Sequence, residues 1–186
     1  MPPLTPLFEK AFHMAFDLHS RQARKSSDVP YVAHLLSVCG LVLEMGGSED
    51  EAIAALLHDA VEDQGGIAVL NLIRAEFGDA VAEIVHGCSD CEEYPKPPWR
   101  ERKESYLAHL EVAPLNVLRV SLADKLHNAR DICMVYQQMN EQAFDRFKGG
   151  ADGTRWYYQR CVEIFSRRMP GVWTNELARV VACFTK

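Results

Sequence analysis

The chain has 186 residues, of which 48% are hydrophobic and 25% are charged, and this composition excludes a disordered, collagenous or fibrous protein. Its formal net charge of −6 argues against broad electrostatic capture of nucleic acid, although a metal ion with a few local Arg or Lys residues still allows a phosphorylated small ligand. No apolar run reaches the roughly 18 residues of a membrane span, and the first residues lack a secretory signal, so we expect a cytoplasmic protein without a membrane anchor.

Nothing in the sequence marks a boundary between two domains, because it has no internal repeat, no low-complexity tract and no Gly/Ser linker. We therefore expect a single domain over residues 1–186. A chain of this size buries about 70% of its unfolded surface, which is enough for a core without disulfides. The six cysteines lie mostly within apolar helical stretches, and we expect them to be reduced.

Apolar residues recur mostly at spacings of three to four, which is typical of helices, and the sequence therefore predicts an all-α fold. The first predicted helix covers residues 6–19. The second covers residues 32–45, with a Pro near its start and a Gly pair after its end. A capping box of Ser48 and Glu51 opens the third, which we expect to continue to about residue 63 before another Gly pair.

The rest of the chain predicts further helices, separated by glycines and prolines. Their expected ranges are 67–77, 79–85, 99–110, 115–135, 154–169 and 174–184. Gly78 separates the first two of these, and Pro114 opens the helix that begins at residue 115. Together the elements predict a single helical bundle of about eight or nine helices.

The third predicted helix ends in a group of polar side chains. His58, Asp59, Glu62 and Asp63 follow the apolar residues 54–57, and helical spacings of three and four turn them toward one patch. Three carboxylates held that close repel one another unless a cation lies between them. The adjacent His and Asp offer the nitrogen and oxygen ligands that borderline divalent metals accept. The pattern therefore indicates a metal site.

Two further ligands are expected from helices that otherwise look buried. His34 and Asp124 each interrupt an apolar neighbourhood, and a buried carboxylate is costly unless it is paired or bound to a metal. Taken singly, His34 also fits a core histidine with satisfied hydrogen bonds, and Asp124 fits a helix residue paired with Lys125 or Arg130. Taken together with the polar group of the third helix, both favour a metal centre.

The order of these residues resembles a known pattern. His34, then His58-Asp59, then Asp124 is similar to the H…HD…D pattern of the HD-domain metal-dependent phosphohydrolases. Three segments resemble, more narrowly, the motifs of the RelA/SpoT-type alarmone hydrolases. Residues 24–34 resemble RKSGxPYxxH, residues 54–63 resemble ALLHDxVED and residues 122–130 resemble LADRLHNxR, in the order in which the family has them.

The resemblance implies a small, single-domain HD-type hydrolase that removes pyrophosphate from the 3′ position of guanosine tetra- or pentaphosphate, (p)ppGpp, and releases GDP or GTP. Its partner is then a small purine nucleotide and not a nucleic acid. Adenosine alarmones are an alternative, because no residue in these motifs reads the guanine edge. Another HD-domain phosphohydrolase, such as a 5′-nucleotidase or a dNTPase, and a non-catalytic nucleotide-binding module are further alternatives. The motifs leave the oligomeric state open.

The resemblance also implies roles for individual residues. The cation, usually Mn²⁺ in such enzymes, is held by His34, His58, Asp59 and Asp124. Four protein ligands leave coordination positions open for water and phosphate, and the adjacent catalytic places fall to Glu62 and Asp63. Substrate contacts are implied for Arg24, Lys25, Asn128, Lys103 and Tyr157. A solvated helix face is the alternative for Lys103, and core packing is the alternative for Tyr157.

Overall fold

The structure is a computed structural model that describes residues 4–24, 28–90 and 95–185. Within these ranges the chain is helical, with no strand apart from one isolated bridge between Ala23 and Pro30, and the all-α prediction is confirmed. None of the described helices combines the length and the apolarity that a bilayer crossing requires. The elements, in chain order, are α1 (Pro6–His19), α2 (Val32–Glu44), α3 (Glu49–Leu57), α4 (Ala60–Gln64), α5 (Gly66–Cys88), α6 (Trp99–Leu110), α7 (Leu115–Met139), the 3-10 helix η1 (Asn140–Phe144), α8 (Gly150–Arg168) and α9 (Val172–Val181).

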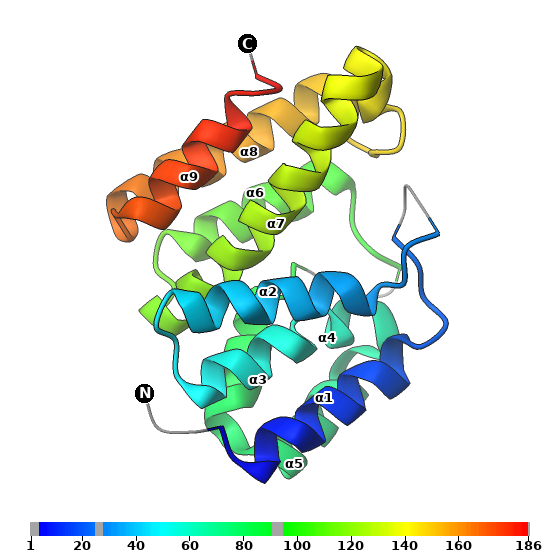
Figure 1. The fold of residues 1–186 in the computed structure, drawn as a ribbon, viewed down its shortest axis with the longest axis vertical. Helices are drawn as coiled ribbons and strands as arrows, with labels where there is room; N and C mark the ends of the chain where they lie inside the picture. The colour runs from blue at the N-terminus through cyan, green and yellow to red at the C-terminus, as the bar shows by residue number, and fades with distance from the viewer. Residues whose placement is uncertain (1–3, 25–27, 91–94, 186) are drawn as a thin grey trace.

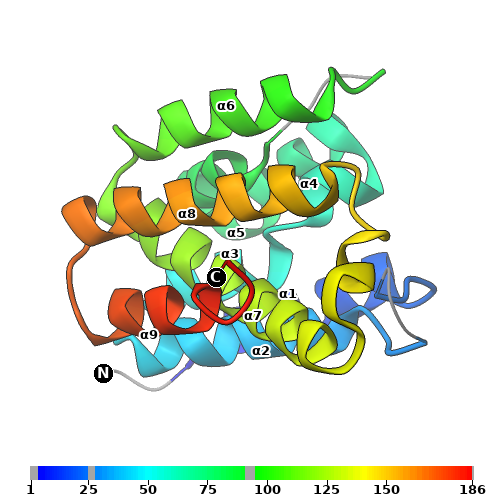
Figure 2. The ribbon, with the colours of Figure 1, turned by 90° about the horizontal axis from the view of Figure 1, so that it is seen from above.

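The long helix α7 joins the two halves of the molecule. It contacts α2, α3 and α5 in one half and α8 and α9 in the other (Figure 1). Seen from above, α8 lies between α6 and α9 (Figure 2). The buried face of α7 includes Leu118, Leu122 and Leu126, which are fully shielded from solvent. Each such side chain contributes roughly 1.5–3 kcal/mol on burial, so the core fixes the backbone that carries Asp124.

The predicted start of the third helix is present. The Ser48 hydroxyl accepts a hydrogen bond from the Glu51 amide, and the Glu51 carboxylate accepts one from the Ser48 amide at 2.6 Å. Glu51 also forms an ion pair with Arg119 of α7. The capping box therefore begins α3 and, through one of its own side chains, ties that beginning to the central helix.

The third helix does not continue to residue 63, as the sequence predicted, because it breaks at His58 and Asp59. α3 ends at Leu57, α4 begins at Ala60, and Asp59 between them has φ −94° and ψ −4°. The His58 side chain supports this break by donating from Nδ1 to the Ala55 carbonyl at 2.8 Å. That bond satisfies a carbonyl in the last turn of α3, where intrahelical partners run out. The break frees two adjacent side chains from strict helical spacing.

The other boundaries follow the predictions with small differences. Gly78 has a φ of 85° and kinks α5 where two helices were expected, and glycine adopts this left-handed region without a side-chain clash. α7 and α8 are each longer than predicted, and α9 begins and ends earlier. The prediction missed η1, which takes the chain from α7 toward α8 and lacks the apolar periodicity of a longer helix.

The expectation that all cysteines are reduced is wrong for one pair. Cys133 of α7 and Cys183, just after α9, form a disulfide. The two helices lie side by side, so the Cα atoms of these residues come within 5.9 Å, inside the range that a disulfide spans. Among the described residues, Cys39, Cys88 and Cys161 are free thiols. Burial raises the pKa of Cys39 to about 12, so this thiol is unreactive.

Candidate active site

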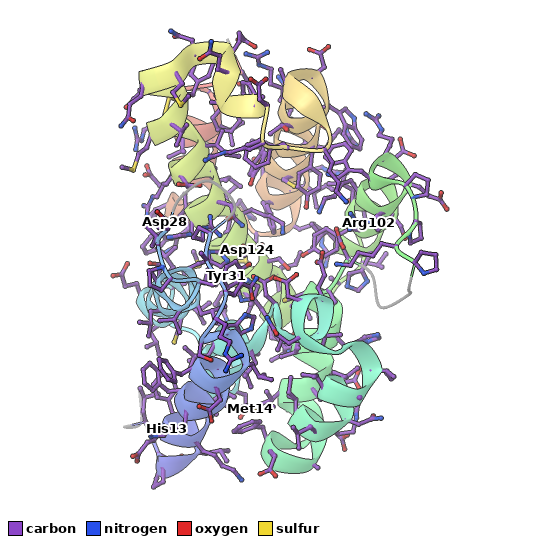
Figure 3. The ribbon with its side chains drawn as sticks, turned by 90° about the vertical axis from the view of Figure 1, so that its right-hand side faces the viewer. His13, Met14, Asp28, Tyr31, Arg102 and Asp124 are labelled. Carbon is purple, nitrogen blue, oxygen red and sulfur yellow. A yellow bond between two sulfur atoms is a disulfide. The ribbon has the colours of Figure 1, made fainter. Side chains whose placement is uncertain are left out.

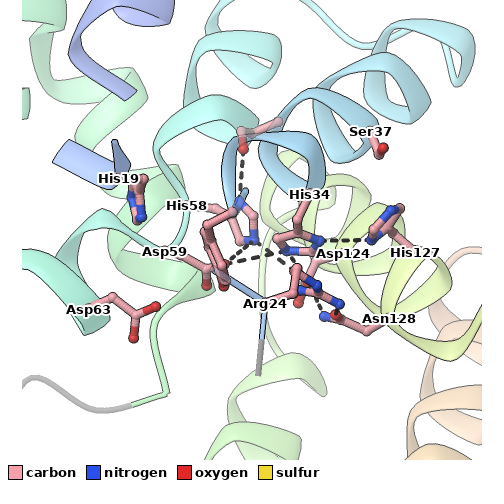
Figure 4. A network of polar contacts seen from close by, with 12 residues as sticks. His19, Arg24, His34, Ser37, His58, Asp59, Asp63, Asp124, His127 and Asn128 are labelled. Atoms are coloured by element: carbon pink, nitrogen blue, oxygen red, sulfur yellow. Dashed lines mark hydrogen bonds and ion pairs between the residues drawn. The ribbon is translucent and has the colours of Figure 1, made fainter. Parts of the chain in front are cut away.

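Four residues predicted as metal ligands come together from three places in the fold. His34 lies on α2, His58 and Asp59 form the break between α3 and α4, and Asp124 lies on α7 (Figure 4). Ligand atoms of His34, His58 and Asp59 all lie within 4.8 Å of one another. Asp124 Oδ1 lies 3.3 Å from His34 Nε2 and 3.6 Å from His58 Nε2. Two imidazoles therefore face two carboxylates.

The hydrogen bonds of the two imidazoles fix which nitrogen can bind a cation. A carbonyl oxygen only accepts, so the Nδ1 of His58 must carry the proton that it gives to Ala55. His34 Nδ1 is bonded to the Nδ1 of His127 at 2.8 Å. Among the residues that the structure describes, the buried Nε2 atoms of His34 and His58 have no hydrogen-bond partner. Two buried lone pairs that point at carboxylates, each held by a bond on the opposite nitrogen, fit a metal site.

Asp59 and Asp124 give the site negative charge beside the two imidazoles. Burial opposes their ionisation, but the charge of His58 beside Asp59, the charge of Lys125 beside Asp124 and the nearby His34 ring hold the pKa of both carboxyls well below the usual range. Burial likewise disfavours a charged His58, yet the same two carboxylates raise its pKa well above the usual value. The site is therefore built to hold positive charge at the imidazole nitrogens.

Neighbouring side chains orient both carboxylates. The Tyr31 hydroxyl donates to Asp59 Oδ2 at 2.6 Å. Lys125 Nζ donates to Asp124 Oδ2 at 2.5 Å, and the Asn128 amide donates to Asp124 Oδ1. The pairing of Asp124 with Lys125, which the sequence left as an alternative to a metal ligand, therefore occurs on one oxygen while the other oxygen faces the imidazoles.

The predicted catalytic residues lie on α4, one turn beyond the break. Glu62 accepts a hydrogen bond from Lys96 Nζ at 2.9 Å. Burial, followed by the negative charge of Asp90, raises its pKa. Asp63 is exposed and accepts from Gln22 Nε2 at 2.8 Å. Glu62, the more buried of the two, is thus the stronger candidate for a proton acceptor.

A cavity of about 370 Å³ lies over these residues, which is a size that suits a nucleotide-like ligand. Its walls include the ligands Asp59 and Asp124, both catalytic candidates and four of the predicted substrate residues, namely Arg24, Lys103, Asn128 and Tyr157. Tyr31, Asp124 and Arg102 lie at the same level of the molecule, between its two halves (Figure 3). The structure therefore brings the predicted metal, catalytic and substrate residues to one place.

A model of the HD domain family matches residues 11–147, which include all four predicted ligands. The chain belongs to the HD domain family. This HD domain is 36% identical over 129 residues to the guanosine-3′,5′-bis(diphosphate) 3′-pyrophosphohydrolase MESH1 of Xenopus tropicalis, a match that covers 68% of the chain and 69% of that protein. It is 36% identical over 126 residues to a probable enzyme of the same name from Synechocystis, covering 66% of the chain but only 16% of that longer protein.

Two solved structures share the fold of this HD domain. One, described as a metazoan ortholog of SpoT that hydrolyses ppGpp, has a TM-score of 0.80 at 23% identity and covers 98% of this chain and 97% of its own. The other, from Listeria monocytogenes, has a TM-score of 0.72 at 30% identity and covers 84% of this chain and 98% of its own. The family implies a divalent metal, and the paired imidazoles and carboxylates described above fit one.

The predicted substrate residues of the HD domain differ in how they are held. Arg24 donates to the Asn128 side chain at 2.8 Å and faces Asp131 at 3.5 Å. Lys103 Nζ binds Asp90 at 2.6 Å and lies 5.0 Å from the centre of the Tyr157 ring. Tyr157 is almost fully buried, as the core-packing alternative has it, yet part of it lines the cavity. Lys25 lies outside the described residues.

Several cavity and supporting residues were missed by the sequence reasoning. His127 fixes the ring of His34, Asp90 holds Arg102 and Lys103 at 2.5 and 2.6 Å, and Arg146 and Lys96 line the cavity. His127 had a signal, since it lies inside the segment that resembles LADRLHNxR. Asp90, Lys96 and Arg146 lie in connections between helices, where periodicity carries no information.

Proposed function

We propose that this HD domain is a metal-dependent 3′-pyrophosphohydrolase of (p)ppGpp that releases pyrophosphate together with GDP or GTP. The observation that carries the proposal is the pair of buried, unpartnered imidazole nitrogens facing Asp59 and Asp124, one helical turn from Glu62, on the wall of a nucleotide-sized cavity. The names of the curated relatives support the substrate class. We further propose Mn²⁺ as the cation, the cytoplasm as the compartment and one domain over residues 1–186.

The ligand roles follow from the hydrogen bonds of the side chains. His34, His58, Asp59 and Asp124 would hold the cation, since the Nε2 atoms of both imidazoles converge on one oxygen of each carboxylate. When bound, a divalent cation supplies Lewis acidity toward water and neutralises phosphate charge. Tyr31 and Asn128 each occupy one carboxylate oxygen, so that the orientation of both ligands is set before substrate arrives.

In the proposed reaction, the oxygen of a water molecule forms a bond to the phosphorus that is attached to the 3′ oxygen, and the bond between that phosphorus and the 3′ oxygen breaks. Glu62 accepts a proton from the water, because its raised pKa makes it a better base than an exposed carboxylate. The 3′ oxygen leaves and gains a proton from solvent, and Glu62 then returns its own proton to solvent. Asp63, close by on α4 and held by Gln22, orients the attacking water.

The cationic side chains of the cavity would bind the phosphates. Lys96, Arg102 and Lys103 lie beside Glu62 and Asp90, so they offer positive charge next to the proton acceptor. Arg24 presents its guanidinium near Tyr31, and a planar guanidinium of this kind stacks on a purine base. Lys103 and Tyr157 are adjacent, and we assign both to substrate contact.

The proposal is tested by the turnover of guanosine tetraphosphate with Mn²⁺, with products separated by anion-exchange chromatography. The adenosine tetraphosphate analogue, dGTP and GMP serve as competing substrates, and Asp59→Ala is the control variant. We expect GDP and pyrophosphate from the wild type and neither from the variant. Preferred turnover of the adenosine compound would change the base assignment. Turnover of dGTP or GMP alone, or metal binding with no turnover, would refute the proposal.

A further inference from the structure

The two sides of the cavity differ in how many carboxylates pair with their positively charged side chains. On the side of α6, Lys96 is paired with Glu62 at 2.9 Å, while Arg102 and Lys103 are paired with the buried Asp90. Three cations therefore face two carboxylates there, and each cation touches one of them. Substrate phosphates that bind on this side compete with bonds that already exist.

A larger excess of positive charge is found where the chain passes from η1 to α8. This segment brings Arg146 and Lys148 to the cavity wall near Arg24. Arg24 and Arg146 share one carboxylate, that of Asp131, at 3.5 and 3.3 Å. Lys148 has no ion-pair partner among the residues that the structure describes. Three cations thus face one carboxylate, which leaves an excess of positive charge in a protein of net charge −6.

Arg146 is the residue of this group that most needs a further partner. Its side chain is only 14% exposed, and its Nε and Nη1 are buried with no hydrogen-bond acceptor in the part of the chain that the structure describes. A buried donor without an acceptor is costly, and a buried guanidinium more so. An anion entering the cavity gives these donors an acceptor after a small rotation of the side chain, in the bidentate geometry that guanidinium groups favour with phosphate.

The position of Arg146 is fixed by packing rather than left to a loose loop. The Trp99 ring lies against the backbone of Gly149 and Gly153, so closely that a Cβ at Gly149 would come within 2.6 Å of it. A series of contacts then runs from Arg146 through Asp131, Arg24 and Asn128 to the proposed metal ligand Asp124. The excess charge therefore lies a few side chains away from the reacting centre.

We propose that Arg146 and Lys148, together with Arg24, form a second anion subsite, which binds the phosphate arm of the substrate that is not hydrolysed. This inference rests on the proposed function, in which that arm is the 5′-diphosphate of guanosine tetraphosphate. The subsite makes the protein selective for nucleotides with two phosphate arms over nucleotides with one. The reacting 3′-diphosphate then binds between the metal ligands and the cations near Glu62.

The test compares guanosine tetraphosphate with guanosine 3′-diphosphate, which has the same reacting arm and a free 5′-hydroxyl. Both are assayed with the wild type and with Arg146→Met, which keeps an unbranched chain against Phe147 but removes the charge. Lys148→Met removes an exposed charge that the fold does not need, and Arg146→Lys is the rescue variant. Arg160→Met is the matched control, because Arg160 is an exposed α8 residue paired with Glu163.

For the two-armed substrate we expect Arg146→Met to raise KM about 30-fold and Lys148→Met to raise it about threefold, as loss of charge-assisted hydrogen bonds does. We expect kcat to stay within about twofold, Arg146→Lys to recover part of the loss, and Arg160→Met to have no effect. For the one-armed substrate all variants should keep the wild-type KM. An equal rise for both substrates, or no rise for either, would overturn the subsite.

Equilibrium binding separates this inference from the proposed function. The affinity for each nucleotide is measured by calorimetry on Glu62→Gln, with and without the additional change Arg146→Met. The Glu62→Gln background allows binding to be measured without turnover. If the wild type hydrolyses neither nucleotide but only the tetraphosphate loses affinity with Arg146→Met, the reaction assignment fails and the subsite stands. If hydrolysis occurs and Arg146→Met leaves binding of the tetraphosphate unchanged, the reaction assignment stands and the subsite fails. Absence of binding of either nucleotide overturns both.

Discussion

The proposed metal centre and the proposed phosphate-binding walls of the same cavity are built in different ways. The four proposed ligands are short side chains, and each is held by a hydrogen bond with a neighbour such as Tyr31, His127 or the Ala55 carbonyl. Apart from Lys125 of α7, the cations of the walls are long side chains on α6 and on the connections between helices. This difference indicates that the core fixes the position of the proposed reacting centre. The affinity and selectivity for the proposed nucleotide substrate then depend on the charge balance of side chains near the surface.

The largest effect is expected where the core holds the centre. Asp59→Asn keeps the shape of the side chain and an acceptor for Tyr31 but removes the charge that faces His34 and His58. We expect turnover of guanosine tetraphosphate to fall by at least about 10³-fold and Mn²⁺ affinity to fall with it. Assays at saturating Mn²⁺ and calorimetric titration of the metal check this. Turnover within tenfold of wild type at high Mn²⁺ would contradict the assignment.

Glu62→Gln separates proton transfer from metal binding. Glu62 touches Lys96 and not the proposed ligands, so the variant should bind Mn²⁺ as the wild type does. We expect kcat to fall about 100-fold or more, because the amide accepts no proton, while KM changes little. The pH profile provides the decisive readout, since its acidic limb should flatten in the variant. A full loss of metal binding would move Glu62 to the ligand set.

Replacing Asp90 tests whether the ion pairs of the cavity wall near α6 contribute to the free energy of unfolding. Burial opposes its ionisation, but Lys103 and Arg102 lower its pKa to about 2. A lowered folded-state pKa contributes stability above the unfolded value, here about 2 kcal/mol at neutral pH, and this contribution is lost as the pH falls from about 4 to about 2.

Urea unfolding of the wild type and of Asp90→Asn should therefore show a gap that is widest at pH 7 and narrows toward pH 3. Glu83→Gln, which alters an exposed pair with Arg74, is the control and should show a small gap that varies little over this range. A gap for Asp90→Asn that is independent of pH would show that the carboxylate contributes by packing alone.

The smallest effect concerns the packing that places Arg146. In Gly149→Ala the new methyl group meets the Trp99 ring, so we expect a loss of about 1 kcal/mol and a raised KM for the two-armed substrate. Gly40→Ala is the matched control, because Gly40 lies within α2 with open space around it, and it should be stabilising by about 0.5–1 kcal/mol. Thermal unfolding and steady-state kinetics measure both. A neutral Gly149→Ala would mean that Trp99 does not fix the segment.

Most of the features that the sequence predicted correctly are those that depend on local spacing. The helical periodicity and the capping box of Ser48 predicted the all-α fold and most helix positions, because they depend on local spacing. The convergence of His34, His58, Asp59 and Asp124 was predicted because ionisable side chains within apolar runs need a common partner. The break at His58 depends on a side-chain bond to Ala55, and no periodicity reveals such a bond.

The cavity walls were much harder to predict. Lys103 and Tyr157 were identified only by resemblance, and Arg146 was missed, although it stands in an Arg-Phe-Lys-Gly-Gly segment between two helices. The segment that carries Arg146 packs through Gly149 against Trp99, which is distant in sequence. Contacts of this kind depend on the tertiary arrangement, so a single sequence offers no spacing from which to infer them.

The position of α9 has a consequence for synthesis on the ribosome. α9 is the last of the described helices to be translated, yet it packs on α7, which carries Asp124 and Asn128. Until α9 emerges, part of the apolar surface of α7 stays open to solvent and to wrong partners. The helix that carries the proposed ligand Asp124 therefore keeps one face uncovered until α9 has been made. We expect the capacity to bind the cation tightly to arise late, after translation has passed residue 181.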